Sequence, residues 1–147
     1  YRSDGDDTQV AIRLSLAERA SLDWLPQEQI LFDGSRLART LDVALGCEAR
    51  LTLVESVFFG RAAFGESLRS AAFRDRWRVR REGRLVFAED VRIDGPVAER
   101  LARPAIGGGA RAAATILHVA PDAEGRLEEA RAALEGCASE AGASAWN

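Results

Sequence analysis

The stretch that decides the fold is FRDRWRVRREGRLVFAEDV, residues 73–91. Two segments with alternating apolar and polar side chains flank the residues Arg81-Glu82-Gly83. A three-residue loop with glycine in the left-handed backbone conformation joins the strands of many β-hairpins. The sequence therefore predicts an antiparallel hairpin whose large apolar side chains share one face. The predicted cross-strand pairs are Val79 with Leu85, Trp77 with Phe87, and Phe73 with Val91.

This register also places two carboxylates, Asp75 and Glu89, directly opposite each other on the apolar face. Neighbouring carboxylates repel each other unless they are hydrated, protonated or bridged by a cation. Divalent metal ions accept carboxylate ligands, and glycoside hydrolases use two facing carboxylates for catalysis. Both chemistries remain open, as does a register shifted by one residue that would turn both side chains toward solvent.

Alternating apolar residues recur in residues 10–16, 37–45 and 51–59, and glycine-containing turns separate these segments. Short strands with closely spaced turns are typical of an all-β framework. Residues 14–36 and 41–63 share a rhythm of apolar pairs, an acidic residue, an aromatic residue, glycine and arginine, at an offset of about 27 residues. The predicted fold is therefore mainly β: a coiled, solenoid-like stack of short strands with one or two short helices.

Two segments have the features of helices. Residues 95–104 can form two helical turns, with Pro96 in the first helical position and Pro104 after the end. A C-terminal helix is predicted over about residues 122–136, with Asp122 as its N-cap and acidic residues in its first turns. The apolar stripe of this helix consists of Leu127, Ala130, Leu134 and Cys137.

The length of 147 residues predicts one domain. The chain has no Met and begins almost at once with a strand pattern, so we expect it to be an internal part of a longer protein. Its formal net charge of −3 offers no overall attraction to nucleic acid or to an anionic membrane. No apolar run approaches the roughly 18 residues of a membrane span. Two cysteines are too few for a disulfide framework, which favours reduced thiols in a cytoplasmic protein.

Nucleophilic and zinc chemistry find little support in the sequence. His118 is the only histidine, and it alternates with apolar neighbours, which predicts that it faces away from the buried side of its strand. There is no nucleophile-elbow motif, and Cys47 and Cys137 lack the spacing of a zinc site. The glycines at 107–109 lack the Lys-Ser/Thr pair of a phosphate-binding loop, so they predict a turn before a strand.

One face of the first hairpin strand carries four arginines: Arg74, Arg76, Arg78 and Arg80. Nucleic-acid binding is the less favoured reading, because Trp77 points to the opposite face and Arg74 faces Asp90 in the predicted register. We expect either a solvated strand face or a docking surface for an acidic protein, since arginine suits bidentate pairing with carboxylates.

The stretch WLPQEQILFDGSR, residues 24–36, interrupts a strand pattern with polar residues. Pro26 has no N–H to donate, so we expect the strand to break or bulge there and to re-aim Gln27 and Glu28. Further carboxylates lie in or beside apolar segments, and we expect the set to form a polar lining within a β scaffold. The set consists of Glu28, Glu55, Glu66, Asp75 and Glu89.

These segments, in this order and spacing, resemble the UreD (UreH) family of urease accessory proteins. The family pattern L-P-Q-E-x-I-x-F is matched at residues 25–32, and F-G-R-x-x-x-G-E is matched at residues 59–66. The arginine-rich W-x-[IV]-x-R hairpin is matched at residues 77–83, and residues 101–124 are similar to the segment that follows it in the family. The resemblance covers essentially the whole chain.

The resemblance implies a non-catalytic scaffold with a β-rich, helically coiled strand arrangement. Such a protein binds apo-urease and the partner UreF, which recruits the GTPase UreG. Nickel then passes from UreG through a water-filled passage in the scaffold, so transient nickel is expected but no tightly bound cofactor. Family members are longer at both ends, so residues 1–147 would be a single UreD-like domain truncated at both ends.

Seven residues are the candidates for the passage lining or for partner contacts: Gln27, Glu28, Asp33, Arg61, Glu66, Asp75 and Glu89. No catalytic residue is expected, and the sequence names no metal ligand. No nucleic-acid or membrane partner is expected, whereas uncovered strand edges predict that this part of the protein self-associates. The alternative function is a β-solenoid carbohydrate-active enzyme that uses the facing carboxylates.

Overall fold

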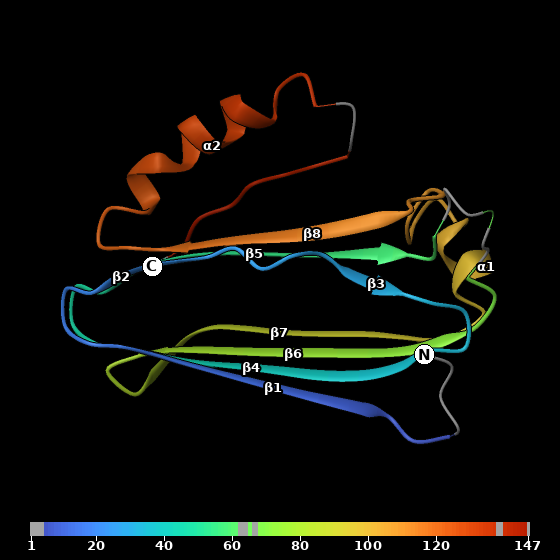
Figure 1. Ribbon diagram of the computed structural model, residues 1–147. Helices are drawn as coiled ribbons and strands as arrows, with labels where there is room; N and C mark the ends of the chain where they lie inside the picture. Colours follow the sequence, from blue (N-terminus) through green and yellow to red (C-terminus); the bar gives the residue numbers. More distant parts are fainter. Residues whose placement is uncertain (1–4, 62–64, 66–67, 138–139, 147) are drawn as a thin grey trace.

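The computed structural model describes residues 5–61, 65, 68–137 and 140–146. Two β-sheets face each other; one short helix lies at an end of the space between them, and the other lies outside the second sheet (Figure 1). The prediction of a mainly β fold with one or two short helices is confirmed. The solenoid-like stack stays a prediction.

The first sheet has the strand order β1-β4-β6-β7. Its strands are β1 (Thr8–Leu16), β4 (Arg36–Leu45), β6 (Ala71–Arg81) and β7 (Arg84–Gly95). The pairs β1–β4 and β4–β6 are parallel, and β6–β7 is the antiparallel hairpin. Among the strands described, β1 and β7 are therefore the two edges of this sheet.

The second sheet is built around β5 (Arg50–Phe59). Both β2 (Ser21–Trp24) and β3 (Gln29–Leu31) pair with β5 in parallel, and β8 (Ala112–Val119) pairs with its other side in antiparallel orientation. The link between β2 and β3 contains Pro26, so the break predicted at this proline is confirmed.

The internal repeat has a structural counterpart. In each copy the chain passes from the first sheet to the second, and β1 lies beside β4 with Thr8 paired to Leu37. In the other sheet, Ser21 on β2 is paired with Arg50 on β5. The two copies of the repeat therefore lie next to each other in parallel, strand for strand.

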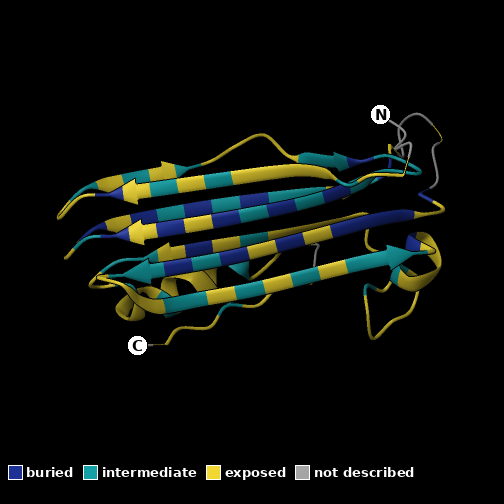
Figure 2. Cartoon of the chain, turned by 90° about the horizontal axis from the view of Figure 1, so that it is seen from below, coloured by how far each residue is buried: buried dark blue, intermediate teal, exposed yellow. Residues whose placement is uncertain are grey.

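Inward-facing apolar side chains form two core clusters between the sheets. Burial alternates along the strands of the first sheet, as the sequence pattern requires (Figure 2). Each fully buried Leu, Val or Phe side chain contributes about 1.5–3 kcal/mol to stability. The larger cluster includes Leu41, Val43, Leu51, Leu53, Trp77 and Val79, and the smaller one Leu31, Leu37, Leu68, Phe73 and Val97.

The predicted hairpin register is wrong by two residues. The turn has two residues, Glu82 and Gly83, both with positive φ (49° and 79°), as a type I′ turn requires. A β-bulge between Val79 and Arg80 adds a second shift, because it changes the pairing by one residue. Because a shift by two residues keeps every side chain on its face, the apolar face is as predicted. The observed pairs are Val79 with Phe87, Trp77 with Glu89, Asp75 with Val91, and Phe73 with Ile93.

The helices are shorter than predicted. Helix α1 spans Val97–Leu101, and Pro96 is its N-cap rather than its first helical residue. In place of one helix over about residues 122–136, a 3₁₀ turn at Glu124–Arg126 precedes α2 (Leu127–Leu134). No residue of α2 is buried, so its apolar stripe is not covered.

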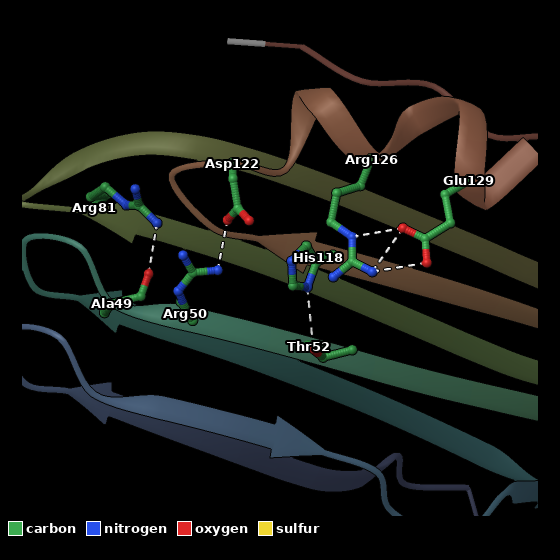
Figure 3. A network of polar contacts seen from close by, with 8 residues as sticks. All are labelled: Ala49, Arg50, Thr52, Arg81, His118, Asp122, Arg126 and Glu129. Carbon is green, nitrogen blue, oxygen red and sulfur yellow. Dashed lines mark hydrogen bonds and ion pairs between the residues drawn. The ribbon is translucent and has the colours of Figure 1, made fainter.

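Polar contacts tie the segment before α2 to the second sheet (Figure 3). Asp122 is not the helix cap, because its carboxylate instead accepts a hydrogen bond of 2.6 Å from Nη1 of Arg50 on β5. His118 is exposed while its neighbour Leu117 is buried, which confirms the predicted direction of the histidine. The imidazole Nδ1 lies 3.2 Å from Oγ1 of Thr52.

Candidate functional site

A cavity of about 430 Å³ lies between the two sheets. Its walls come from the inward faces of β4, β5, β6 and β7, from β8, and from α1 with the loop after it. Most wall residues are apolar, among them Trp77, Val91 and Ile106. Six ionisable residues also line it, namely Arg39, Glu55, Asp75, Glu89, Arg92 and Arg100. The cavity therefore provides a charged surface inside an otherwise apolar sandwich.

Arg39 is the centre of this charged group. It lies on β4 directly beside Asp75 on β6, and its Nε and Nη2 donate to the two oxygens of that carboxylate at 2.9 and 2.5 Å. Its Nη1 donates to Glu55, which lies on β5 in the opposite sheet. The Glu55 carboxylate also accepts a hydrogen bond of 3.1 Å from Nε1 of Trp24. One guanidinium thus joins the two sheets.

The three ions are almost fully removed from solvent, with exposed fractions of 7% for Arg39, 6% for Glu55 and 7% for Asp75. Burying an unpaired charge is costly. An arginine is tolerated at this inward position of β4 because Asp75 and Glu55 both pair with its charge. Burial opposes the positive charge of Arg39, but the hydrogen bonds and charges of Asp75 and Glu55 outweigh it and raise the pKa of the guanidinium. The triad carries one positive and two negative charges.

Glu89 adds a further carboxyl group at the side of the triad. It lies on β7 opposite Trp77, so it is diagonal to Asp75 rather than directly opposite, as the corrected register requires. Burial raises the pKa of Glu89, and the negative charge of Asp75 raises it further. In the described part of the chain, the Glu89 carboxylate has no ion-pair partner, and the raised pKa agrees with the predicted repulsion between the two carboxyl groups.

We expect Glu89→Gln to stabilise the protein at about pH 8 and to have less effect as the pH falls toward about 5. Because the pKa of Glu89 is raised on folding, the native state holds this proton more tightly than the unfolded state does. That stabilisation is lost as the pH rises through the folded-state pKa, and glutamine removes the charge that causes the loss. Thermal unfolding across this pH range measures the difference. The exposed Glu124→Gln serves as the control, and a pH-independent effect of Glu89→Gln would contradict the expectation.

The structure places the other predicted site residues elsewhere. Gln27 and Glu28 are exposed in the link between β2 and β3, so Glu28 is not one of the buried carboxylates. Asp33 lies in the turn between β3 and β4, where hydrogen bonds from the Ser70 N–H and from Arg69 lower its pKa. The guanidinium of Arg61 lies 4.8 Å from the centre of the Phe32 ring.

Of the seven predicted site residues, only Asp75 and Glu89 come together at the cavity, and Glu66 lies outside the described residues. The central residue, Arg39, was missed by sequence reasoning. The sequence feature that could have identified it is a charged residue at a position where the alternating pattern of the strand requires an apolar one, between Leu37 and Leu41.

The described residues contain neither a metal-binding cluster nor a membrane-spanning helix. No group of three or more His, Cys, Asp or Glu side chains in this part of the chain is placed to hold a metal ion. Within the same residues, no helix has both the length and the apolar character needed to cross a membrane.

Comparison with known proteins shows to which family the chain belongs. The sequence model of the family described as "UreD urease accessory protein" matches residues 1–147. The chain belongs to this family. A urease accessory protein UreD of Methylobacterium sp. (strain 4-46) is 57% identical over 152 residues, which is 100% of this chain and 54% of the relative.

Other relatives agree with this assignment. The urease accessory protein UreD of Xanthobacter autotrophicus is 51% identical over 147 residues, covering 100% of this chain and 51% of the relative. That of Azorhizobium caulinodans is 48% identical over 147 residues, with 100% and 54% covered. The chain thus spans about half the length of the curated relatives it matches.

Proposed function

We propose that the protein is a non-catalytic scaffold in urease maturation that assists nickel insertion into apo-urease, in complexes with UreF and UreG. Membership of the urease accessory family supports a role in urease maturation. The observation that carries the proposal is the cavity between the sheets, in which Arg39, Glu55, Asp75 and Glu89 line a space within an apolar sandwich. A carrier of a hydrated ion needs such a polar path through its core.

The charges of the cavity suit the transit of a cation better than its storage. Carboxylate oxygens attract divalent cations, and Glu55, Asp75 and Glu89 supply three such groups. Arg39 neutralises part of this charge and occupies both Asp75 oxygens. A nickel ion that enters would meet carboxylates partly neutralised by arginine rather than a complete set of ligands, so nickel is cargo in this proposal.

The exposed candidates fit contacts with partner proteins better than a lining. Gln27 and Glu28 stand in an open link at the surface, and they are available to a partner without any rearrangement. A cytoplasmic location is part of the proposal, and it agrees with Cys47 and Cys137, which are both free and exposed. Self-association through the edge strands β1 and β7 would be a further property of this part of the protein.

A carbohydrate-active enzyme is the second candidate, because Glu89, with its raised pKa, lies near a second carboxyl group, Asp75, as in the pair of carboxyl groups of a glycoside hydrolase. Its weakness is Asp75, since both carboxylate oxygens already accept hydrogen bonds from Arg39. Release of reducing sugar from glycans by the purified protein would favour this candidate.

Deletion of the gene in a urease-producing host tests the scaffold. We expect the deletion strain to accumulate apo-urease and to lose most of its urease activity, because nickel no longer reaches the active site. Urease activity and nickel content per urease subunit are the measurements, and the wild-type gene supplied in trans should restore both. Full activity of the deletion strain in medium without added nickel would refute the proposal.

A further inference from the structure

The outer face of the first sheet, which points away from the cavity, is rich in arginine. In the sheet register, outward positions on β1, β6 and β7 bring these side chains onto one surface. Three aspartates, Asp42 on β4 with Asp90 and Asp94 on β7, are interleaved with them, and Asp94 lies 3.3 Å from Arg92. The arginines of this basic face are Arg13, Arg74, Arg76, Arg78, Arg80 and Arg92.

The strand between the arginines keeps the basic face open. The outward residues of β4 in this region are small or short, namely Ala38, Thr40, Asp42 and Ala44. Long guanidinium groups on both sides therefore rise above the level of β4, with no large side chain on this strand to cover them. A partner surface can approach the guanidinium groups directly.

Only some of these arginines are neutralised within the chain. Arg78 forms a 2.5 Å ion pair with Asp90, while Arg80 is 3.8 Å from Asp42. Arg13 and Arg76 are exposed, and neither has an ion pair among the described residues. The basic face therefore keeps unused hydrogen-bond donors in a geometry that suits carboxylates.

The basic face stands out against the charge of the rest of the chain. Six arginines and three aspartates share it, whereas the whole chain carries a formal charge of −3. The remaining surface is accordingly acidic. We propose that this face is a docking surface for an acidic protein partner, whose Asp and Glu side chains pair with the free guanidinium groups.

An acidic protein fits this face better than a nucleic acid does. The nearby aromatic residue, Trp77, is buried on the opposite side of β6, so it cannot stack on a base. Asp42 and Asp90 would repel a continuous row of phosphates. A protein partner can place a basic or neutral residue opposite each aspartate, so a mixed pattern of charge is matched only by a protein.

Binding of fluorescein-labelled poly-L-glutamate to the intact protein tests the proposal, with anisotropy as the readout at low and moderate salt. We expect Arg13→Gln/Arg76→Gln to weaken binding about two- to tenfold, because two exposed charge pairs are lost. The matched control is Arg103→Gln/Arg111→Gln, two exposed arginines outside this face, and it should bind as the wild type does. Both variants change exposed side chains, so thermal unfolding should match that of the wild type.

Labelling with phenylglyoxal locates the contact independently of the variants. We expect bound poly-L-glutamate to protect Arg76 and Arg13 from the reagent more than Arg103. Equal weakening by the control variant, or no protection of Arg76, would overturn the proposal. Tighter binding of a DNA duplex than of poly-L-glutamate at the same salt concentration would also overturn it, in favour of a nucleic-acid surface.

Discussion

Replacing Arg39 with Met lowers the free energy of unfolding by about 3–5 kcal/mol, the range expected when one member of a buried ion group is removed. Glu55 and Asp75 would remain buried without their cation, and the ion pairs that join the two sheets through Arg39 would be lost. Denaturant unfolding of the intact protein measures the change. Arg76→Met is the control, because this exposed arginine lacks an ion pair in the described chain, and its effect should stay within about 0.5 kcal/mol.

A combined variant separates charge from packing at this site. Arg39→Met together with Glu55→Gln and Asp75→Asn removes all three charges, so it should recover much of the stability lost in Arg39→Met alone. If Arg39→Met costs no more than its exposed control, the ion triad does not stabilise the contact between the sheets.

On the proposed function, replacing Ala113 with Trp should leave the protein folded and greatly reduce the activation of urease in the host. Ala113 lies on β8 opposite Val57, where it lines the cavity and remains accessible to solvent. An indole at this position would fill open space rather than overpack a closed core, so stability should change little. Urease activity and nickel content in a deletion strain that carries the variant are the measurements.

The control for this substitution is Ala132→Trp, which adds the same side chain at an exposed position on α2, outside both the cavity and the basic face. This variant should support urease activation as the wild type does. Normal activation by a folded Ala113→Trp protein would show that the cavity is not the route of the metal.

The strands could be predicted because burial of one face leaves a local pattern, as in Leu41, Val43 and Leu45. The register of the hairpin could not, since it depends on a non-glycine residue, Glu82, with positive φ and on a bulge at Val79. Neither has a reliable local signature. The error was harmless for the faces only because the two shifts add to an even number.

The sequence predicted only the part of the site whose residues lie close together along the chain. Asp75 and Glu89 belong to one hairpin, so their proximity follows from pairing nearby residues. The contact of Arg39 with Glu55 requires knowing that β4 and β5 lie in different sheets that face each other. Likewise, Asp122 stands at a position where the sequence predicts a helix cap, but its carboxylate accepts a hydrogen bond from Arg50, which is distant in the sequence.

The parallel arrangement of the first sheet also constrains the order in which it can assemble. Among the described strands, only β6 and β7 meet through a tight turn, and parallel strands need long connections. Long connections lose more conformational entropy on closure before their contacts form, so the β6–β7 hairpin can form first with the smallest entropic cost. Strand β4 can then add to β6, and β1 to β4. Synthesis runs in the opposite direction, so β1 leaves the ribosome well before the surface on which it pairs exists.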